Sequence, residues 1–193
     1  MANPLLFTYD DVSIYQGDLD TLKPGQWLND QIISFSMARI EKTLHDSGTA
    51  VRFLDASLVS CLRLQLDDDD EDDTKGFVEG IGLTTSSAVV VPLTNRTSMD
   101  THSTHWSLLY IDLNDDLALH LDSHHNYNHG AAEMATSDIY QLLKRAEVPE
   151  VIDVKCPQQE NGYDCGIFTI LHAQCLAEGK VLHSFRIFWL YDL

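Results

Sequence analysis

Apolar residues recur at helical spacing in the segment NDQIISFSMARIEKTLHD, residues 29–46. Four of them fall on one face of the helix that this spacing predicts: Ile33, Met37, Ile40 and Leu44. Asn29 precedes the first apolar position, and its short side chain can accept a hydrogen bond from a free backbone N–H of the first turn. We therefore predict an amphipathic helix that begins just after Asn29.

Two later segments also have a helical pattern. AAEMATSDIYQLLKRAE, residues 131–147, predicts a surface helix. CGIFTILHAQCL, residues 165–176, predicts another helix, and Asp164 is placed to cap its start. Four residues are expected to share one face of this last helix: Ile167, Ile170, Leu171 and Cys175.

Short apolar runs predict strands between these helices. AVVVPL covers residues 88–93, and VIDV covers 151–154. HWSLLYIDL and LALHLDS flank the polar residues 114–116 as two strands flank a hairpin turn. Helices alternate with strands, and neighbouring strands are joined by a hairpin, so we expect an α+β fold. The chain of 193 residues has the length of one domain, which we place over residues 1–193.

The run DDDDEDD at 67–73 repels itself and cannot pack, which predicts a solvated loop over about residues 66–75. The whole chain is acidic, with a net charge of -18 and a pI near 4.5. Nucleic-acid binding needs a positive field, so we expect no nucleic-acid partner and instead a partner with a basic surface.

The start MANPLLFTYDD lacks the charged and apolar regions of a secretory signal, and no stretch of 18 apolar residues occurs. We expect a monomer without a membrane partner, located in the cytoplasm or nucleus and not secreted. The four cysteines are then expected to be reduced thiols, any of which is a candidate nucleophile.

Cys165 is distinguished by its position between a polar turn and the first turn of an apolar helix. The dipole and free N–H groups of a helix N-terminus stabilise a thiolate. Cys61 and Cys175 lie within apolar runs and are expected to be inert core thiols, and Cys156 precedes a proline. Local context alone therefore makes Cys165 only a candidate nucleophile.

A cysteine nucleophile needs a base, and the base needs a third group to orient it. His105 opens one strand of the expected hairpin and Asp122 closes the other, so antiparallel pairing brings them to the same end of the sheet. Whether they share a face depends on a register that the sequence does not fix. Taken alone, His105 is equally well interpreted as a surface histidine, and Asp122 as a turn aspartate at the end of a strand.

Acyl transfer also needs hydrogen-bond donors for the oxyanion. Gln158 and Gln159 lie seven and six residues before Cys165, in the same polar turn. Two adjacent glutamines in a loop are usually solvated, but their position makes both of them candidate donors.

Four motifs together resemble the Ulp/sentrin-specific cysteine proteases. They are WLND at 27–30, THWSLL at 104–109, DS at 122–123 and CPQQENGYDCG at 156–166. The likeness extends from about residue 9 to about residue 176, in the family's order His, Asp, Gln, Cys. It implies a single papain-like domain with a mixed sheet flanked by helices and a nucleophile at a helix N-terminus.

The resemblance also implies a role for each matching residue. Cys165 would attack, His105 would act as base and later acid, and Asp122 would orient His105. Gln159 would supply the amide of the oxyanion hole. The reaction would be cleavage after the C-terminal Gly-Gly of a ubiquitin-like modifier, without a cofactor.

Trp27 and Trp106 match the family's aromatic walls over the glycine tail, and Asp30 matches a position that helps to hold the tail. A flat aromatic slot admits glycines and excludes larger side chains. The alternative is that Trp27 and Trp106 are ordinary core aromatics.

Within the family, the segments TYDDV, GDLDTL, WLND and THWSLL look most like the deneddylases, which act on the Nedd/Rub modifier. The alternatives are a SUMO-specific protease and a module that binds a modifier without cleaving it. The second alternative arises because the chain ends at SFRIFWLYDL, soon after the nucleophile helix, where the family continues; the C-terminus is thus apparently shortened.

Six of the nine histidines fall between His102 and His129, which makes a zinc site the rival interpretation. His124, His125 and His129 follow Asp122 closely, but no HExxH or CxxC pattern accompanies them. We expect no metal, and solvated loop histidines or contacts with the modifier.

Overall fold

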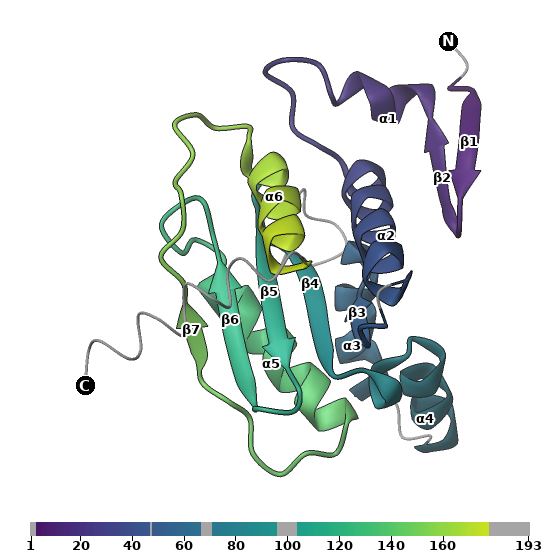
Figure 1. Ribbon diagram of the computed structural model, residues 1–193, viewed down its shortest axis with the longest axis vertical. Coiled ribbons are helices and arrows are strands. Elements are labelled where there is room, and N and C mark those ends of the chain that lie inside the picture. Colours follow the sequence, from purple (N-terminus) through teal and green to yellow (C-terminus); the bar gives the residue numbers. More distant parts are fainter. Residues whose placement is uncertain (1–2, 47, 67–70, 96–103, 178–193) are drawn as a thin grey trace.

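A five-stranded mixed sheet forms the centre of the computed structural model, which describes residues 3–46, 48–66, 71–95 and 104–177 (Figure 1). Its strands, in spatial order, are β3 (Val51–Phe53), β4 (Ala88–Thr94), β5 (Trp106–Asp112), β6 (Leu117–Leu121) and β7 (Val151–Asp153). The three central strands are antiparallel, and the two outer strands pair in parallel with their neighbours. The predicted α+β fold, its hairpin and its mixed sheet are confirmed.

Helices cover both faces of this sheet (Figure 1). On one face lie α2 (Asp30–Asp46) and α6 (Cys165–Ala177), which pack against Val90, Leu108 and Tyr110. On the other lie α3 (Ala56–Leu66) and α5 (His129–Leu142), which pack against Val89, Val91 and Leu109. Successive strand residues point to opposite faces, and both faces of the central strands are covered by helices. Nearly every position of these strands is therefore buried, and most of them are apolar.

Smaller elements lie at the edge of this arrangement. The hairpin of β1 (Leu5–Tyr9) and β2 (Val12–Tyr15) is followed by α1 (Gln16–Asp20), and it stands beside α2, away from the main sheet (Figure 1). Phe7 and Tyr9 of the hairpin each contact the ring of Phe35 on α2 edge-on, with ring centroids 5.5 Å apart. The remaining elements are α4 (Glu71–Gly80) and a 3₁₀ turn, η1 (Leu83–Thr85).

The first predicted helix is confirmed as α2, and its cap is formed as expected. The Oδ1 atom of Asn29 accepts a hydrogen bond from the backbone N–H of Ile32 at 3.2 Å. Ile33, Met37 and Leu44 are buried, while Ile40 is half-buried. The cap thus fixes the start of α2 directly after the WLND motif.

The helix α6 is confirmed, and its buried face is not the one that carries Ile167 and Leu171. Ile167 and Leu171 are 40% and 49% exposed. The buried residues of α6 are Cys165, Gly166, Thr169, His172, Ala173 and Leu176. The face of α6 that carries Cys165 packs against the sheet, so Ile167 and Leu171 on the other side of the helix are exposed to solvent.

Two other predicted boundaries differ from the structure. The helix predicted for 131–147 is α5, which begins at His129 and ends at Leu142; Lys144 then adopts a left-handed backbone with φ of 52°. The acidic loop predicted over about 66–75 is wrong for residues 71–75, which belong to α4. Acidic residues are favourable in a first helical turn, and Val78 of α4 is buried in the core. Residues 67–70 lie outside the described part of the chain.

The C-terminus predicted to be shortened falls on residues 178–193, which also lie outside the described part of the chain. Every helix within the described ranges is too short or too polar to cross a membrane.

The start of α6 approaches the WLND segment very closely. A Cβ atom on Gly166 would lie 3.0 Å from the Cβ atom of Leu28 and 3.3 Å from the Cδ1 atom of Ile33. Such distances are tighter than most contacts of real Cβ atoms, so any larger residue at this position would require Leu28 or α6 to shift.

We predict that Gly166→Ala lowers the free energy of unfolding by about 1–3 kcal/mol, because the added methyl group must push α6 away from Leu28. Denaturant unfolding measures this effect. Gly76→Ala in α4 is the matched control: nothing lies within 4 Å of its added Cβ, and alanine favours a helix by up to about 1 kcal/mol. Equal stability of the two variants would contradict the close approach.

Candidate active site

Cys165 is the first residue of α6 and is only 2% exposed. The turn before it is shaped by Asn161, whose Oδ1 atom accepts hydrogen bonds from the backbone N–H groups of Tyr163 and Asp164. The predicted cap residue Asp164 gives its backbone carbonyl to the N–H of Phe168, while its carboxylate accepts a hydrogen bond from Asn161 Nδ2 at 2.7 Å. This turn holds the Cys165 thiol at a helix N-terminus, where a thiolate is stabilised.

His105 and Asp122 meet at one end of the β5–β6 pair. The pairing of Leu108 with Leu121 places Asp122 one step beyond the end of β6. There the Nε2 atom of His105 lies 2.6 Å from Oδ1 of Asp122, and both side chains are almost completely buried. The register left open by the sequence is therefore the one that brings the two residues into contact.

Asp122 is held by several donors at once. Its Oδ1 atom also accepts a hydrogen bond from the backbone N–H of His124 at 2.8 Å, and its Oδ2 atom accepts one from the N–H of Asn128 at 3.0 Å. Burial acts to raise the pKa of Asp122, but the hydrogen bond to His105, together with these two backbone hydrogen bonds, outweighs it and holds the pKa below its usual value. Asp122 is therefore a carboxylate at neutral pH.

The same contacts determine the state of His105. Burial acts to lower its pKa, but hydrogen bonds to Asp122 and Cys165 raise it to about 9. An ionised carboxylate only accepts hydrogen bonds, so Nε2 of His105 carries a proton toward Asp122 and the Nδ1 atom is left to exchange a proton with Cys165. The arrangement can form a thiolate–imidazolium pair, which is the reactive form of a cysteine nucleophile.

This pKa shift also has a consequence for stability. Because the folded pKa of about 9 exceeds the ordinary value of 6.5, the protonated His105 stabilises the fold fully below about pH 6.5. The contribution is lost as the pH rises through about 9.

The two candidate oxyanion donors differ in how their amides are used. Gln158 donates from Nε2 to the carbonyl oxygens of Asp122 and Cys156, which occupies both of its N–H bonds. Gln159 donates from Nε2 to the carbonyl of Asn161 at 2.6 Å, and its Oε1 atom accepts from the Ser123 hydroxyl. An amide has two N–H bonds, so Gln159 retains a second one for an oxyanion.

The two tryptophans occupy different environments. Trp27 is 49% exposed, and its indole N–H donates to the carbonyl of Gly162, three residues before Cys165, at 2.6 Å. Trp106 is 4% exposed and donates to the carbonyl of Leu28 at 3.0 Å. Trp27 is thus an exposed wall beside the nucleophile turn, whereas Trp106 is a core residue beneath it. Asp30 begins α2 close by, with an exposed carboxylate.

Two residues that support the site, Asn128 and Ser123, were not assigned a role from the sequence. Asn128 donates its backbone N–H to Asp122 and its Nδ2 atom to the hydroxyl of Ser107. Ser123 accepts the backbone N–H of Gln159 in addition to its contact with that side chain. The DS motif, which contains Ser123, could have indicated its role. Nothing in the sequence indicated a role for Asn128, because its contacts are made only in the folded chain.

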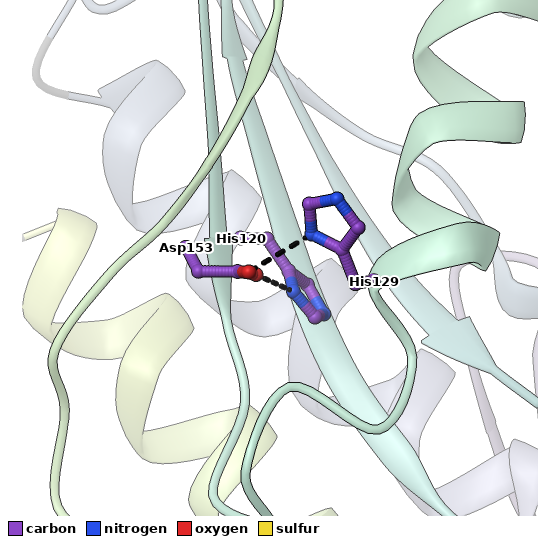
Figure 2. Close-up of side chains that lie close together, drawn as sticks. All are labelled: His120, His129 and Asp153. Atoms are coloured by element: carbon purple, nitrogen blue, oxygen red, sulfur yellow. Dashed lines mark hydrogen bonds and ion pairs between the residues drawn. The ribbon is translucent and has the colours of Figure 1, made fainter.

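The histidines of this region that the structure describes separate into two groups. The rings of His124 and Tyr127 lie beside His105, with centroids 5.6 and 5.7 Å away. His129 instead joins His120 and Asp153 (Figure 2).

Comparison with known proteins assigns the family. Residues 26–188 match the Ulp1 protease family, C-terminal catalytic domain. The chain belongs to the Ulp1 protease family. It is therefore a cysteine peptidase, and the predicted enzyme class is confirmed.

Several known proteases resemble most of the chain. It is 32% identical to the probable sentrin-specific protease 8 of Dictyostelium discoideum, over 88% of this chain and 74% of the relative. It is 25% identical to the NEDD8-specific protease 1 of Arabidopsis thaliana, over 90% of this chain and 75% of the relative. The fold is also similar to that of the yeast Ulp1 protease domain in complex with Smt3, with a TM-score of 0.69 and 24% identity. The match covers 93% of this chain and 78% of the yeast domain. The last comparison confirms the fold.

The raised pKa of His105 predicts the alkaline limit of activity. We expect kcat/KM to fall as the pH rises through about 9, because the imidazolium that must protonate the leaving group is lost. In Asp122→Asn the fall should begin at lower pH, since the hydrogen bond to Asp122 is the largest contribution that raises this pKa, and kcat should drop by about 10²–10⁴-fold. Asp115→Asn, in the β5–β6 turn, should keep the wild-type profile. An unchanged profile in Asp122→Asn would contradict this assignment.

The free N–H of Gln159 predicts a selective effect on turnover. Gln159→Ala should lower kcat by about 10²–10³-fold with a small change in KM, because an oxyanion exists only during the reaction. Gln158→Ala is the matched control, since both of its N–H bonds are used inside the protein, and it should mainly lower thermal stability. Equal loss of kcat in both variants would instead assign Gln159 a structural role.

Proposed function

We propose that this peptidase cleaves after the C-terminal Gly-Gly of a ubiquitin-like modifier, with Nedd/Rub preferred. The observation that carries the proposal is the position of the buried His105–Asp122 pair beside Cys165, with Trp27 tied to the turn that precedes it. Precursor processing and removal of the modifier from conjugates use the same chemistry, because both break a bond to the carbonyl of the terminal glycine.

In the proposed reaction, the Cys165 thiolate attacks the carbonyl carbon of the terminal glycine and forms a tetrahedral oxyanion. The N–H of Cys165 and the second N–H of Gln159 stabilise this oxyanion. The oxyanion then collapses to a thioester as His105 gives a proton to the leaving amine. Water, deprotonated by His105, hydrolyses the thioester and restores the thiol.

The surroundings of Cys165 support a glycine tail as the substrate. The thiol is almost completely buried, so a substrate must reach it through a narrow approach. The indole of Trp27 is fixed at this approach by its hydrogen bond to Gly162. A pair of glycines fits against a fixed aromatic ring, whereas larger side chains would be excluded sterically. Asp30, at the start of α2, is proposed to contact the tail or the surface around it.

The preference for Nedd/Rub is supported by the relatives, among which are proteases named for sentrin and for NEDD8. The net charge of -18 supports a modifier with a basic face. A SUMO-specific protease remains the second candidate, because the Ulp1 domain of similar fold is bound to a SUMO orthologue. Action as an intracellular monomer without nucleic acid stays a prediction.

A panel of Nedd, SUMO and ubiquitin probes, each with an electrophile at the C-terminal glycine, tests this proposal. We expect the Nedd probe to form a covalent adduct at Cys165 at least about tenfold faster than the other two, as judged by mass spectrometry. Faster capture of the SUMO probe would contradict the preference for Nedd but not the proposed cleavage.

The matched control for this panel is Cys165→Ala. It should form no adduct but bind unmodified Nedd as tightly as the wild type, because the contacts that bind the modifier do not depend on the thiol. Binding of Nedd without capture by the wild type would favour a binding module and overturn the proposed cleavage.

A further inference from the structure

A second group of polar side chains lies behind Asp122, outside the residues used for catalysis. His120 on β6 and Asp153 on β7 are direct neighbours in the parallel pairing of these strands. His129, the first residue of α5, lies against the same carboxylate. Figure 2 shows both imidazole rings beside the carboxylate of Asp153, with dashed lines joining each ring to it.

The distances in this group are short. The Nδ1 atom of His120 lies 2.8 Å from Oδ1 of Asp153, and the Nδ1 atom of His129 lies 2.9 Å from Oδ2. One ligand atom from each of the three residues lies within 4.8 Å of the others. Around a tetrahedral zinc ion, ligand atoms at about 2.0–2.2 Å from the metal are about 3.4 Å from one another. The two histidines contact different oxygens of Asp153, and whichever oxygen binds the metal, its short distance to a histidine nitrogen needs to open by only about half an ångström.

The ring nitrogens that face away from Asp153 also have suitable partners. Nε2 of His120 lies 3.0 Å from the Ser107 hydroxyl, and Nε2 of His129 lies 3.4 Å from Oε1 of Glu133. Metal-binding histidines usually donate their second N–H to such an acceptor, which fixes the ring and frees the other nitrogen for the metal. A hydroxyl can either donate or accept, so His120 can move its proton from Nδ1 to Nε2 without a change in charge.

We propose that His120, His129 and Asp153 bind a divalent transition-metal ion of the Zn²⁺ type. Two imidazole nitrogens and one carboxylate oxygen are a ligand set that zinc accepts, with the fourth position left for water. The side chains of His129 and Asp153 are 37% and 27% exposed, so an ion can enter from solvent, while the fully buried His120 forms the inner wall.

The position of the site connects it to the catalytic residues. Nε2 of His120 lies 3.9 Å from Oδ2 of Asp122. The Ser107 hydroxyl, which contacts His120, also accepts a hydrogen bond from Asn128, whose backbone N–H binds Asp122. A metal ion would fix the proton of His120 on Nε2, and this network would carry the change to Asp122.

Zinc titration of the full chain carrying Cys165→Ser tests the proposal, because this substitution removes the thiol that would otherwise bind zinc itself. Competition against a chromogenic zinc chelator should reveal one saturable site. His129→Gln and Asp153→Asn, added to Cys165→Ser, should each weaken binding at least about tenfold and abolish the rise in melting temperature caused by zinc. His45→Gln, on the distant end of α2, is the matched control and should bind as before.

Glu133→Ala provides a variant that keeps the fold, since this side chain is 63% exposed. It should weaken zinc binding by about tenfold, because it removes the acceptor for His129 Nε2. Absence of saturable binding to the Cys165→Ser protein would overturn the proposal. Equal affinity in the His129→Gln, Asp153→Asn and His45→Gln proteins would also overturn it, because the zinc would then be held by other residues.

Discussion

The hydrogen bond of 2.6 Å between His105 and Asp122 is the interaction on which the active site depends. Both groups are buried, and burying an ionisable pair is costly unless all its hydrogen bonds are satisfied. Two backbone N–H groups from the segment after β6 donate further hydrogen bonds to Asp122, so both of its oxygens have a donor. That segment and the start of α5 are thereby held in place, and the charge that stabilises the His105 imidazolium stays in a water-poor environment.

The second constraint is the position of α6. Gly166 lies against Leu28, Trp27 donates to Gly162, and Ser123 binds Gln159 through both backbone and side chain. The nucleophile turn is thus joined to two segments, around Trp27 and around Ser123, that are far apart in the sequence. Such cross-links make the position of the thiol a property of the whole domain, because movement of either segment would displace Cys165 from His105.

The family membership and the geometry support each other for different reasons. The family model and the relatives rest on sequence and identify a cysteine peptidase. The structure adds the means by which this chain could perform that reaction: an ionised Asp122, a raised His105 pKa and a Gln159 amide with one free N–H. The His120, His129 and Asp153 group follows from neither the motifs nor the family, since it arises only where β6, β7 and α5 meet.

The sequence by itself determined the helices α2, α5 and α6, the hairpin, the α+β class and the identity of the residues around Cys165, because each depends on local periodicity, capping or a contiguous motif. It did not indicate α3 or decide which face of α6 is buried, and its prediction for residues 71–75 was wrong, because packing against the rest of the domain outweighs the local pattern. Only the tertiary structure decided the register that joins His105 to Asp122, the different roles of Gln158 and Gln159, and the burial of Trp106. These features depend on distances between residues far apart in the chain, and such distances are set only when the sheet and both helical layers pack together.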